Sequence, residues 1–354
     1  MGWKSGGIVV LVLSLVGGAI AFAADTGGNL KSWLKEYSRP ADIPFPEENP
    51  YSRAKFELGR ALFFESMFSR SQTLSCASCH EPRLAWGDGL ARAQGEGTAP
   101  LALRTPTLLN VAWTAPLGWD GKYRSLESVA FGPITMPGNL NMTEADLVRR
   151  LSSRPDYVKA FADAFADGKI SRRNIELAIA TFERLIVSAR APFDRWVEGD
   201  DGAVDDAAKR GFALFNGKGH CAECHSGWAF TDGSFHDIGT AQGSDIGRGR
   251  LFPTSVKLRY AFKTPTLRDV ARRAPYMHDG SVPTLEAVID LYDRGGIARP
   301  SRSETIKPLG LTAQEKSDLL AFLQTLTGDP GPSPAPALPR GDLASMKYGQ
   351  AGAE

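Results

Sequence analysis

A five-residue pattern, Cys-x-x-Cys-His, occurs twice in this chain and constrains its fold more than any other feature. The two copies are Cys76-Ala77-Ser78-Cys79-His80 and Cys221-Ala222-Glu223-Cys224-His225. The pattern is the attachment signature of a c-type haem: the two thiols bind the porphyrin covalently, and the imidazole that follows binds the iron. The sequence therefore predicts two covalent haems, with His80 and His225 as the proximal iron ligands.

Two other uses of these cysteines stay open at this point. All four cysteines of the chain lie in the two motifs. A thioredoxin-like redox pair has no need of the histidine that follows each second cysteine. A zinc site made of all four thiols would have to join halves that are 142 positions apart, from Cys79 to Cys221. Haem attachment is favoured, because it uses both cysteines and the histidine of each motif.

The N-terminus has the pattern of a secretion signal. Lys4 precedes an apolar stretch, 8–20, and Ala21-Phe22-Ala23 gives a small-x-small cleavage site. The apolar stretch is short for a bilayer, so we expect cleavage of 1–23 and no stable membrane span. An exported c-type haem protein is expected in the periplasm. The net charge of +1 gives no reason to expect nucleic-acid binding.

An internal duplication divides the rest of the chain. Thr105-Pro106-Thr107-Leu108 recurs 159 positions later as Thr264-Pro265-Thr266-Leu267, and the same offset relates Asp120-Gly121 to Asp279-Gly280. The 354 residues suffice for about two domains. We therefore expect two tandem cytochrome c-like haem domains, an N-terminal one over 51–200 with its helical connection and a C-terminal one over 201–328.

The periodicity of apolar residues and the helix caps predict a mostly α-helical fold. Helices are expected over 51–65 and after four capping residues, Thr143, Ser171, Thr284 and Thr312. No segment has a persuasive strand pattern. The Pro-rich segments at the two ends are expected to be an extended lead-in, 24–50, and a disordered tail, 329–354.

The duplication predicts that the two irons differ. On the helix after Thr284, the apolar spacing turns Tyr292 towards the buried side, where a phenol oxygen can bind haem iron. The equivalent position in the first half is Pro133, which has no ligand atom. The second iron would then have two protein ligands and the first iron one. Met277 is the weaker alternative ligand of the second iron, and ordinary core packing of Tyr292 is the plain alternative. Met136 and Met142 are the competing ligands at the first iron.

Trp119 and His278 occupy equivalent positions, each before an Asp-Gly turn. An indole between two haems could relay electrons, and an imidazole could hydrogen-bond a haem group. Structural packing explains both residues equally well.

From about Pro50 to Thr327, these motifs together resemble the bacterial di-haem cytochrome c peroxidase and MauG family. The resemblance implies that the N-terminal haem activates H₂O₂, that the C-terminal haem transfers electrons, and that Trp119 lies between them. The peroxidases place a methionine ligand fourteen residues after the histidine that matches His278. That position is Tyr292 here, which is similar to the MauG subgroup with its His/Tyr-ligated second haem.

Two positions depart from what the resemblance implies. The family's distal glutamate, which moves a proton during O–O cleavage, is replaced by Asn139, and an amide cannot act as a general acid or base. The family's calcium ion lies between the domains, and its asparagine ligand falls on Arg104. Both efficient peroxide cleavage and calcium binding are therefore left open.

The sequence predicts a periplasmic di-haem c-type oxidoreductase that reacts with H₂O₂. The catalytic candidates are Trp119, Asn139 and His278. By resemblance, the partner is a small cytochrome c or cupredoxin that donates electrons, or a protein substrate that is oxidised at a distance. The alternative is a non-catalytic electron carrier or a haem-based redox or ligand sensor, which Asn139 favours.

Overall fold

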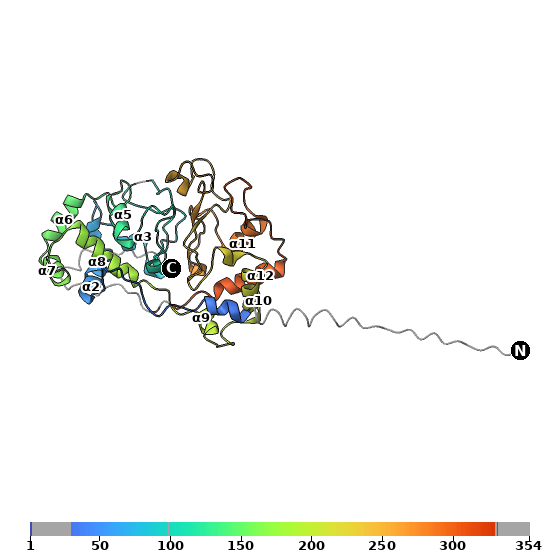
Figure 1. The fold of residues 1–354 in the computed structure, drawn as a ribbon. Helices are drawn as coiled ribbons and strands as arrows, with labels where there is room; N and C mark the ends of the chain where they lie inside the picture. Colours follow the sequence, from blue (N-terminus) through green and yellow to red (C-terminus); the bar gives the residue numbers. More distant parts are fainter. Residues whose placement is uncertain (2–29, 98, 330, 332–354) are drawn as a thin grey trace, which may run out of the picture.

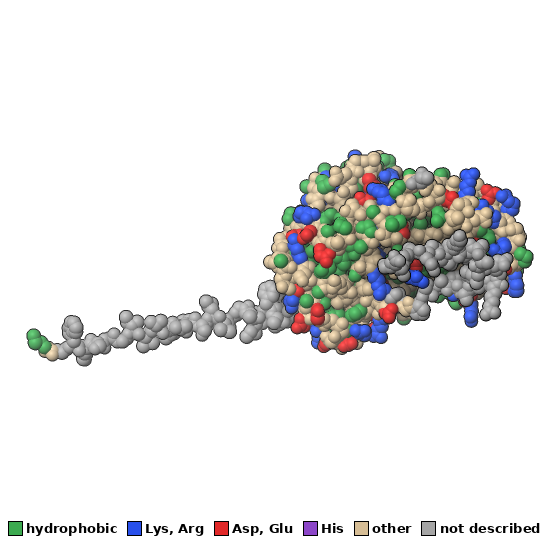
Figure 2. Space-filling view, turned by 180° about the vertical axis from the view of Figure 1, so that it is seen from behind, with side chains coloured by type: hydrophobic (Ala, Val, Ile, Leu, Met, Phe, Trp, Pro, Cys, Tyr) green, Lys and Arg blue, Asp and Glu red, His purple; other side chains and the backbone are tan. Residues whose placement is uncertain are grey.

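The computed structural model describes residues 1, 30–97, 99–329 and 331. The predicted signal peptide and most of the predicted Pro-rich tail lie outside these residues. Within them the chain forms two helical halves that lie side by side (Figure 1). No helix in the described part of the chain is long and apolar enough to cross a membrane. Positive and negative side chains are interspersed over the face drawn in Figure 2.

The first half is built around the crossing of two helices. These are α2 (Arg53–Phe64) and α8 (Arg172–Arg184), capped by the Ser52 and Ser171 side chains. At the crossing, a Cβ on Gly59 would lie 1.9 Å from the Ala178 carbonyl oxygen, so only glycine allows this approach. The shorter elements of this half are η1 (Ser66–Phe68), α3 (Cys76–Cys79), η2 (Pro82–Leu84), η3 (Val111–Trp113), α4 (Leu126–Val129), α5 (Phe131–Thr135), α6 (Glu144–Ser152) and α7 (Pro155–Ala164).

The second half repeats this crossing with α10 (Asp206–Asn216) and α12 (Ala313–Gln324). A Cβ on Gly211 would lie 2.0 Å from the Asp318 carbonyl oxygen. The other elements are α9 (Pro192–Val197), η4 (Cys221–Glu223), β1 (Phe235–His236), η5 (Arg248–Arg250), β2 (Phe262–Lys263), η6 (Val270–Arg272) and α11 (Leu285–Arg294). The two short strands pair antiparallel, and the remaining regular structure of the described residues is helical. The prediction of a mostly α-helical fold is confirmed.

The duplicated segments take the same conformation in both halves. The antiparallel bridge between Leu117 and Tyr123 recurs between Tyr276 and Val282, at the offset of 159. The threonines also match: Thr107 Oγ1 donates to the Ala85 carbonyl oxygen and Thr266 Oγ1 to that of Ala229, both at 2.6 Å. In each half this bond ties the Thr-Pro-Thr segment to the chain just after the haem motif.

The extended lead-in that we expected is partly helical. Residues 30–36 form a helix. Its apolar side chains Leu30, Trp33 and Leu34 pack against the core of the second half, and Tyr37 is buried there with 1% exposure. The prediction was wrong for these residues because it weighed the prolines that follow above the i, i+3, i+4, i+7 spacing of the apolar side chains.

Candidate haem sites

A single cavity of about 720 Å³ runs through both halves and is lined by both Cys-x-x-Cys-His motifs. The four thiols are free of disulfides and lie on its wall. The rest of the lining comes largely from apolar side chains and from the two Thr-Pro-Thr segments. Each half thus supplies two thiols and one imidazole to a mainly apolar cavity, which is the donor set that a covalent haem requires. The residues fit two c-type haems.

In the first half, local structure turns His80 towards the cavity. The motif forms the short helix α3, and His80 is the residue at its C-terminal end. The His80 Nδ1–H donates to the Trp86 carbonyl oxygen at 3.1 Å. Burial lowers the pKa of this imidazole, which keeps it neutral and leaves Nε2 as a free lone-pair donor. A backbone-anchored imidazole of this kind is how proteins orient an iron ligand.

The second half has the same arrangement. His225 follows η4, and its Nδ1–H donates to the Phe230 carbonyl oxygen at 2.9 Å. Burial again lowers the pKa of the imidazole. Both histidines are therefore prepared to bind a metal through Nε2.

The two positions that the duplication makes equivalent, Pro133 and Tyr292, both lie on the cavity wall. Burial raises the pKa of the Tyr292 phenol, and the thiols of Cys221 and Cys224 contribute to the rise, so the phenol lies near the second motif. Met277 lines the cavity as well and remains a geometric alternative to Tyr292.

In the first half, Pro133, Asn139 and Met136 line the cavity. Met136 is 40% exposed, and Met142, the other methionine that could compete as a ligand of the first iron, is packed in the core of the first half with 3% exposure.

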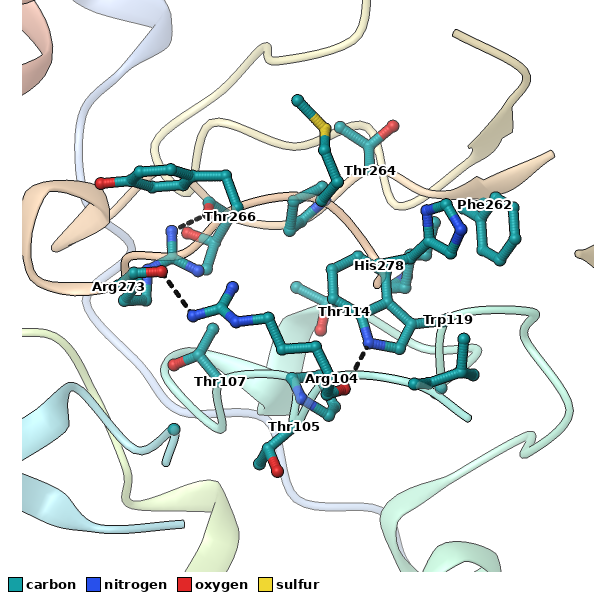
Figure 3. A pocket seen from close by; sticks show the side chains of 18 of the residues that line it. Arg104, Thr105, Thr107, Thr114, Trp119, Phe262, Thr264, Thr266, Arg273 and His278 are labelled. Atoms are coloured by element: carbon teal, nitrogen blue, oxygen red, sulfur yellow. Dashed lines mark hydrogen bonds between the residues drawn. The ribbon is translucent and has the colours of Figure 1, made fainter. Parts of the chain in front are cut away.

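Trp119 and His278 meet at the junction of the two halves (Figure 3). Their rings lie 6.5 Å apart, centroid to centroid, at an angle of 71°. The Trp119 Nε1–H donates to the Arg104 carbonyl oxygen at 2.8 Å. His278 stacks on Phe262 at 3.6 Å, and its Nε2 bonds the Asp245 carboxylate at 2.8 Å. Both rings are therefore held in fixed orientations on the cavity wall.

Sequence reasoning missed two ionisable groups on the cavity wall. His236 bonds Asp232 at 2.7 Å beside Cys224, and this bond raises the pKa of the imidazole to about 10. Glu183 is buried near Cys76 with one carboxyl oxygen unbonded among the described residues, and burial raises its pKa to about 8. Neither residue belongs to a motif, and only the tertiary fold brings them to the cavity.

Comparison with known proteins agrees with this geometry. Residues 53–202 match the family model described as di-haem cytochrome c peroxidase, and residues 208–327 match that of cytochrome c. The chain is 48% identical to the methylamine utilization protein MauG of Methylorubrum extorquens over 330 residues, which cover 93% of this chain and 94% of the relative. The chain belongs to the di-haem cytochrome c peroxidase and MauG family.

Further relatives are consistent with this assignment. Cytochrome c551 peroxidase of Nitrosomonas europaea is 32% identical over 84% of this chain and 86% of its own length. The crystal structure of a MauG-like protein associated with microbial copper homeostasis superposes with a TM-score of 0.77 at 32% identity, covering 83% of this chain and 95% of that one. As a member of this family, the protein is a di-haem peroxidase-type oxidoreductase that carries two c-type haems.

Proposed function

We propose that this protein is a periplasmic, peroxide-dependent oxidoreductase in which the first haem site receives H₂O₂ and the second exchanges electrons with a partner protein. The observation that carries the proposal is the difference between the far walls of two otherwise matching sites. Proline stands at position 133, where the second half has a phenol at position 292, and both positions line the cavity. A site without a second protein ligand has room for a small oxidant.

When bound, the two haems supply the iron that reacts with peroxide and the iron that gains or loses an electron. The residues of the chain fix the setting for this chemistry. Cys76, Cys79 and His80 would hold the first haem. The Asn139 side chain could hydrogen-bond a peroxide or water molecule in this site and orient it, but an amide cannot act as a general acid or base. The proton would then have to come from water or from a more distant group.

Cys221 and Cys224 would attach the second haem, and His225 and Tyr292 would supply its iron with an imidazole nitrogen and a phenol oxygen. Tyr292 is preferred to Met277 because its phenol lies in an apolar setting without a hydrogen bond to any other described residue, and binding to a ferric ion relieves the cost of burying it. A phenolate also stabilises the oxidised iron, which suits a centre that stores an oxidising equivalent.

Trp119 couples the two sites. Its indole is anchored by the Arg104 carbonyl oxygen, and its own carbonyl oxygen accepts from the Lys263 N–H at 2.8 Å, so it is bonded to both halves. His278, held by its bond to the Asp245 carboxylate, packs against the Trp119 indole and keeps it in place. An aromatic ring fixed between two redox centres shortens the path for the electron.

The partner is a redox protein. The relative from Methylorubrum extorquens is named for methylamine utilization. We therefore place the partner of this chain in the same process, with a small cytochrome c or cupredoxin as the electron-donor alternative. The signal-like pattern of residues 1–23 supports the periplasm as the compartment.

EPR of the oxidised holoprotein tests the asymmetry, and stopped-flow mixing with H₂O₂ tests the reaction. We expect one high-spin and one low-spin ferric haem, with a rapid spectral change of the high-spin haem on mixing. Two low-spin haems would refute the open site. A high-spin haem that does not respond to peroxide, together with no turnover of a generic donor, would favour the electron carrier or sensor, the alternative that Asn139 supports.

A further inference from the structure

Two arginines are buried side by side where the halves meet. Arg104 is 8% exposed and Arg273 is 7% exposed, and both line the cavity between the two haem motifs. Arg104 Nη2 donates to the Arg273 carbonyl oxygen, and Arg273 Nη2 donates to that of Thr266 (Figure 3). The Arg104 N–H also donates to the His278 carbonyl oxygen at 2.9 Å, so this segment links the two halves.

Neither guanidinium group contacts a negatively charged side chain among the described residues. Neither forms an ion pair within 4.0 Å, and the Nε atom of each is buried without a hydrogen-bond partner. Burial lowers the pKa of both, that of Arg273 to about 10, and the charge of Arg104 lowers the pKa of Arg273 further. The carboxylates of Asp88 and Asp269 favour the charged forms of Arg104 and Arg273 from beyond ion-pair distance, and they bond Thr105 and Gly328 instead of the guanidinium groups.

Two adjacent buried cations without a contacting counter-charge are unfavourable, so a site of this kind favours an anion that contacts both guanidinium groups. The cavity that these arginines line holds two haems, and each haem carries two carboxylate side chains. A planar guanidinium with free N–H donors is suited to bidentate bonds with a carboxylate. We propose that Arg104 and Arg273 bind the haem carboxylates at the junction and, as a pair, take the place of the calcium ion that the family resemblance implies.

The residues at this position do not fit calcium. Calcium takes six to eight oxygen ligands from carboxylates, carbonyl groups and water molecules. Here the position of the asparagine ligand carries the cationic side chain of Arg104, and a second cation lies beside it. In the described part of the chain, one cluster of side chains could hold a metal ion, and it lies at the second haem motif. It consists of Cys224, Asp232 and His236. Two guanidinium groups carry a total charge of +2, the same as one calcium ion, but this charge belongs to side chains of the protein.

This inference rests on the presence of two haems and not on the reaction with peroxide. The first experiment uses the wild-type holoprotein. We expect less than about 0.1 calcium per chain by atomic emission, and the same low-spin EPR spectrum and haem potentials with EGTA or with added calcium. One calcium per chain in the isolated protein, or a spectrum that changes on chelation, would overturn the proposal.

The second experiment measures the midpoint potentials of both haems by spectroelectrochemistry in Arg104→Gln and Arg273→Gln. Loss of a nearby positive charge favours the oxidised iron, so at least one haem potential falls in each variant. The matched control is Arg272→Gln, which removes the adjacent exposed arginine and leaves the potentials unchanged. Arg104→Lys keeps the charge but loses the two-pronged geometry, so its shift is smaller than that of Arg104→Gln. Wild-type potentials in both Gln variants would contradict the assignment.

Discussion

The Tyr292→Phe variant tests the ligand of the second haem, and the size of its effect follows from the setting of the phenol. A free tyrosine has a pKa of 10.0, and burial beside the second motif raises it further. For Tyr292 to be a phenolate at pH 7, the ferric iron must lower this pKa by at least about three units, which corresponds to about 4 kcal/mol of phenolate stabilisation. Ferrous iron carries one charge less and stabilises the phenolate less, so this energy sets the scale of the preference for the oxidised state. Removal of the hydroxyl removes this preference.

Three pKa units are a thousandfold change in an equilibrium constant, which corresponds to about 180 mV for a one-electron couple, at about 59 mV for each tenfold change. We therefore expect the potential of the second haem to rise by an amount of this order in Tyr292→Phe, and its low-spin EPR signal to change. Tyr292→Met should also raise the potential while it keeps a low-spin iron, because a thioether is a neutral ligand. Spectroelectrochemistry and EPR of the oxidised holoproteins measure both effects.

The matched control is Tyr276→Phe. Tyr276 lines the same cavity, but its hydroxyl donates to the Val270 carbonyl oxygen at 3.0 Å and so has a partner of its own. This control should leave the spectrum of the second haem unchanged. If Tyr292→Phe behaves like the control, Tyr292 is not the ligand, and a Met277→Leu variant that changes the signal would transfer the role to Met277.

Three further changes have defined outcomes. Asn139→Glu supplies a carboxyl where the family has one and should raise the rate of the first haem with H₂O₂ about a hundredfold or more in stopped-flow experiments; no increase would mean that a proton already reaches this site by another route. In the wild type, the buried pair with Arg184 lowers the pKa of Glu127 from 4.5 to about 2. The Glu127→Gln variant breaks this pair. The pair thus stabilises the fold above pH 4.5 and loses this effect as the pH falls towards 2, so urea unfolding should show a loss of about 3 kcal/mol at pH 7 that shrinks at pH 3. Gly211→Ala puts a Cβ 2.0 Å from a backbone oxygen and should destabilise the second half by at least about 3 kcal/mol, whereas Gly202→Ala, with 3.6 Å to its nearest neighbour, should unfold like the wild type.

The sequence was sufficient for the parts of the fold that depend on local chemistry. The Ser52, Ser171, Thr284 and Thr312 side chains cap helices, the last three where expected, because an N-cap needs only a hydroxyl and the N–H groups that follow it. The duplication was equally visible, since its motif residues recur at a constant offset. Local patterns alone therefore identify both haem motifs and the equivalent positions 133 and 292.

The features that sequence reasoning missed depend on long-range packing. Arg273 is buried beside Arg104, which lies 169 positions earlier in the chain. No local sequence pattern indicates this contact. The same holds for Glu183, which reaches the cavity from α8. Residues 30–36 gave a local signal that was outweighed by the prolines after them, and their helix is stabilised by the distant core of the second half.

The difference between the two sites can be traced to one interruption of a helix. In the second half, α11 runs without a break from Leu285 to Arg294 and carries Tyr292 in its last turn. In the first half the equivalent segment is divided at Ala130 into α4 and α5, so that Pro133 falls in the first turn of a new helix. Proline is tolerated there because the first N–H groups of a helix have no intrahelical partner. The duplicated framework thus keeps the same histidine anchor in both halves, while a local change in one helix accommodates a residue that cannot bind iron.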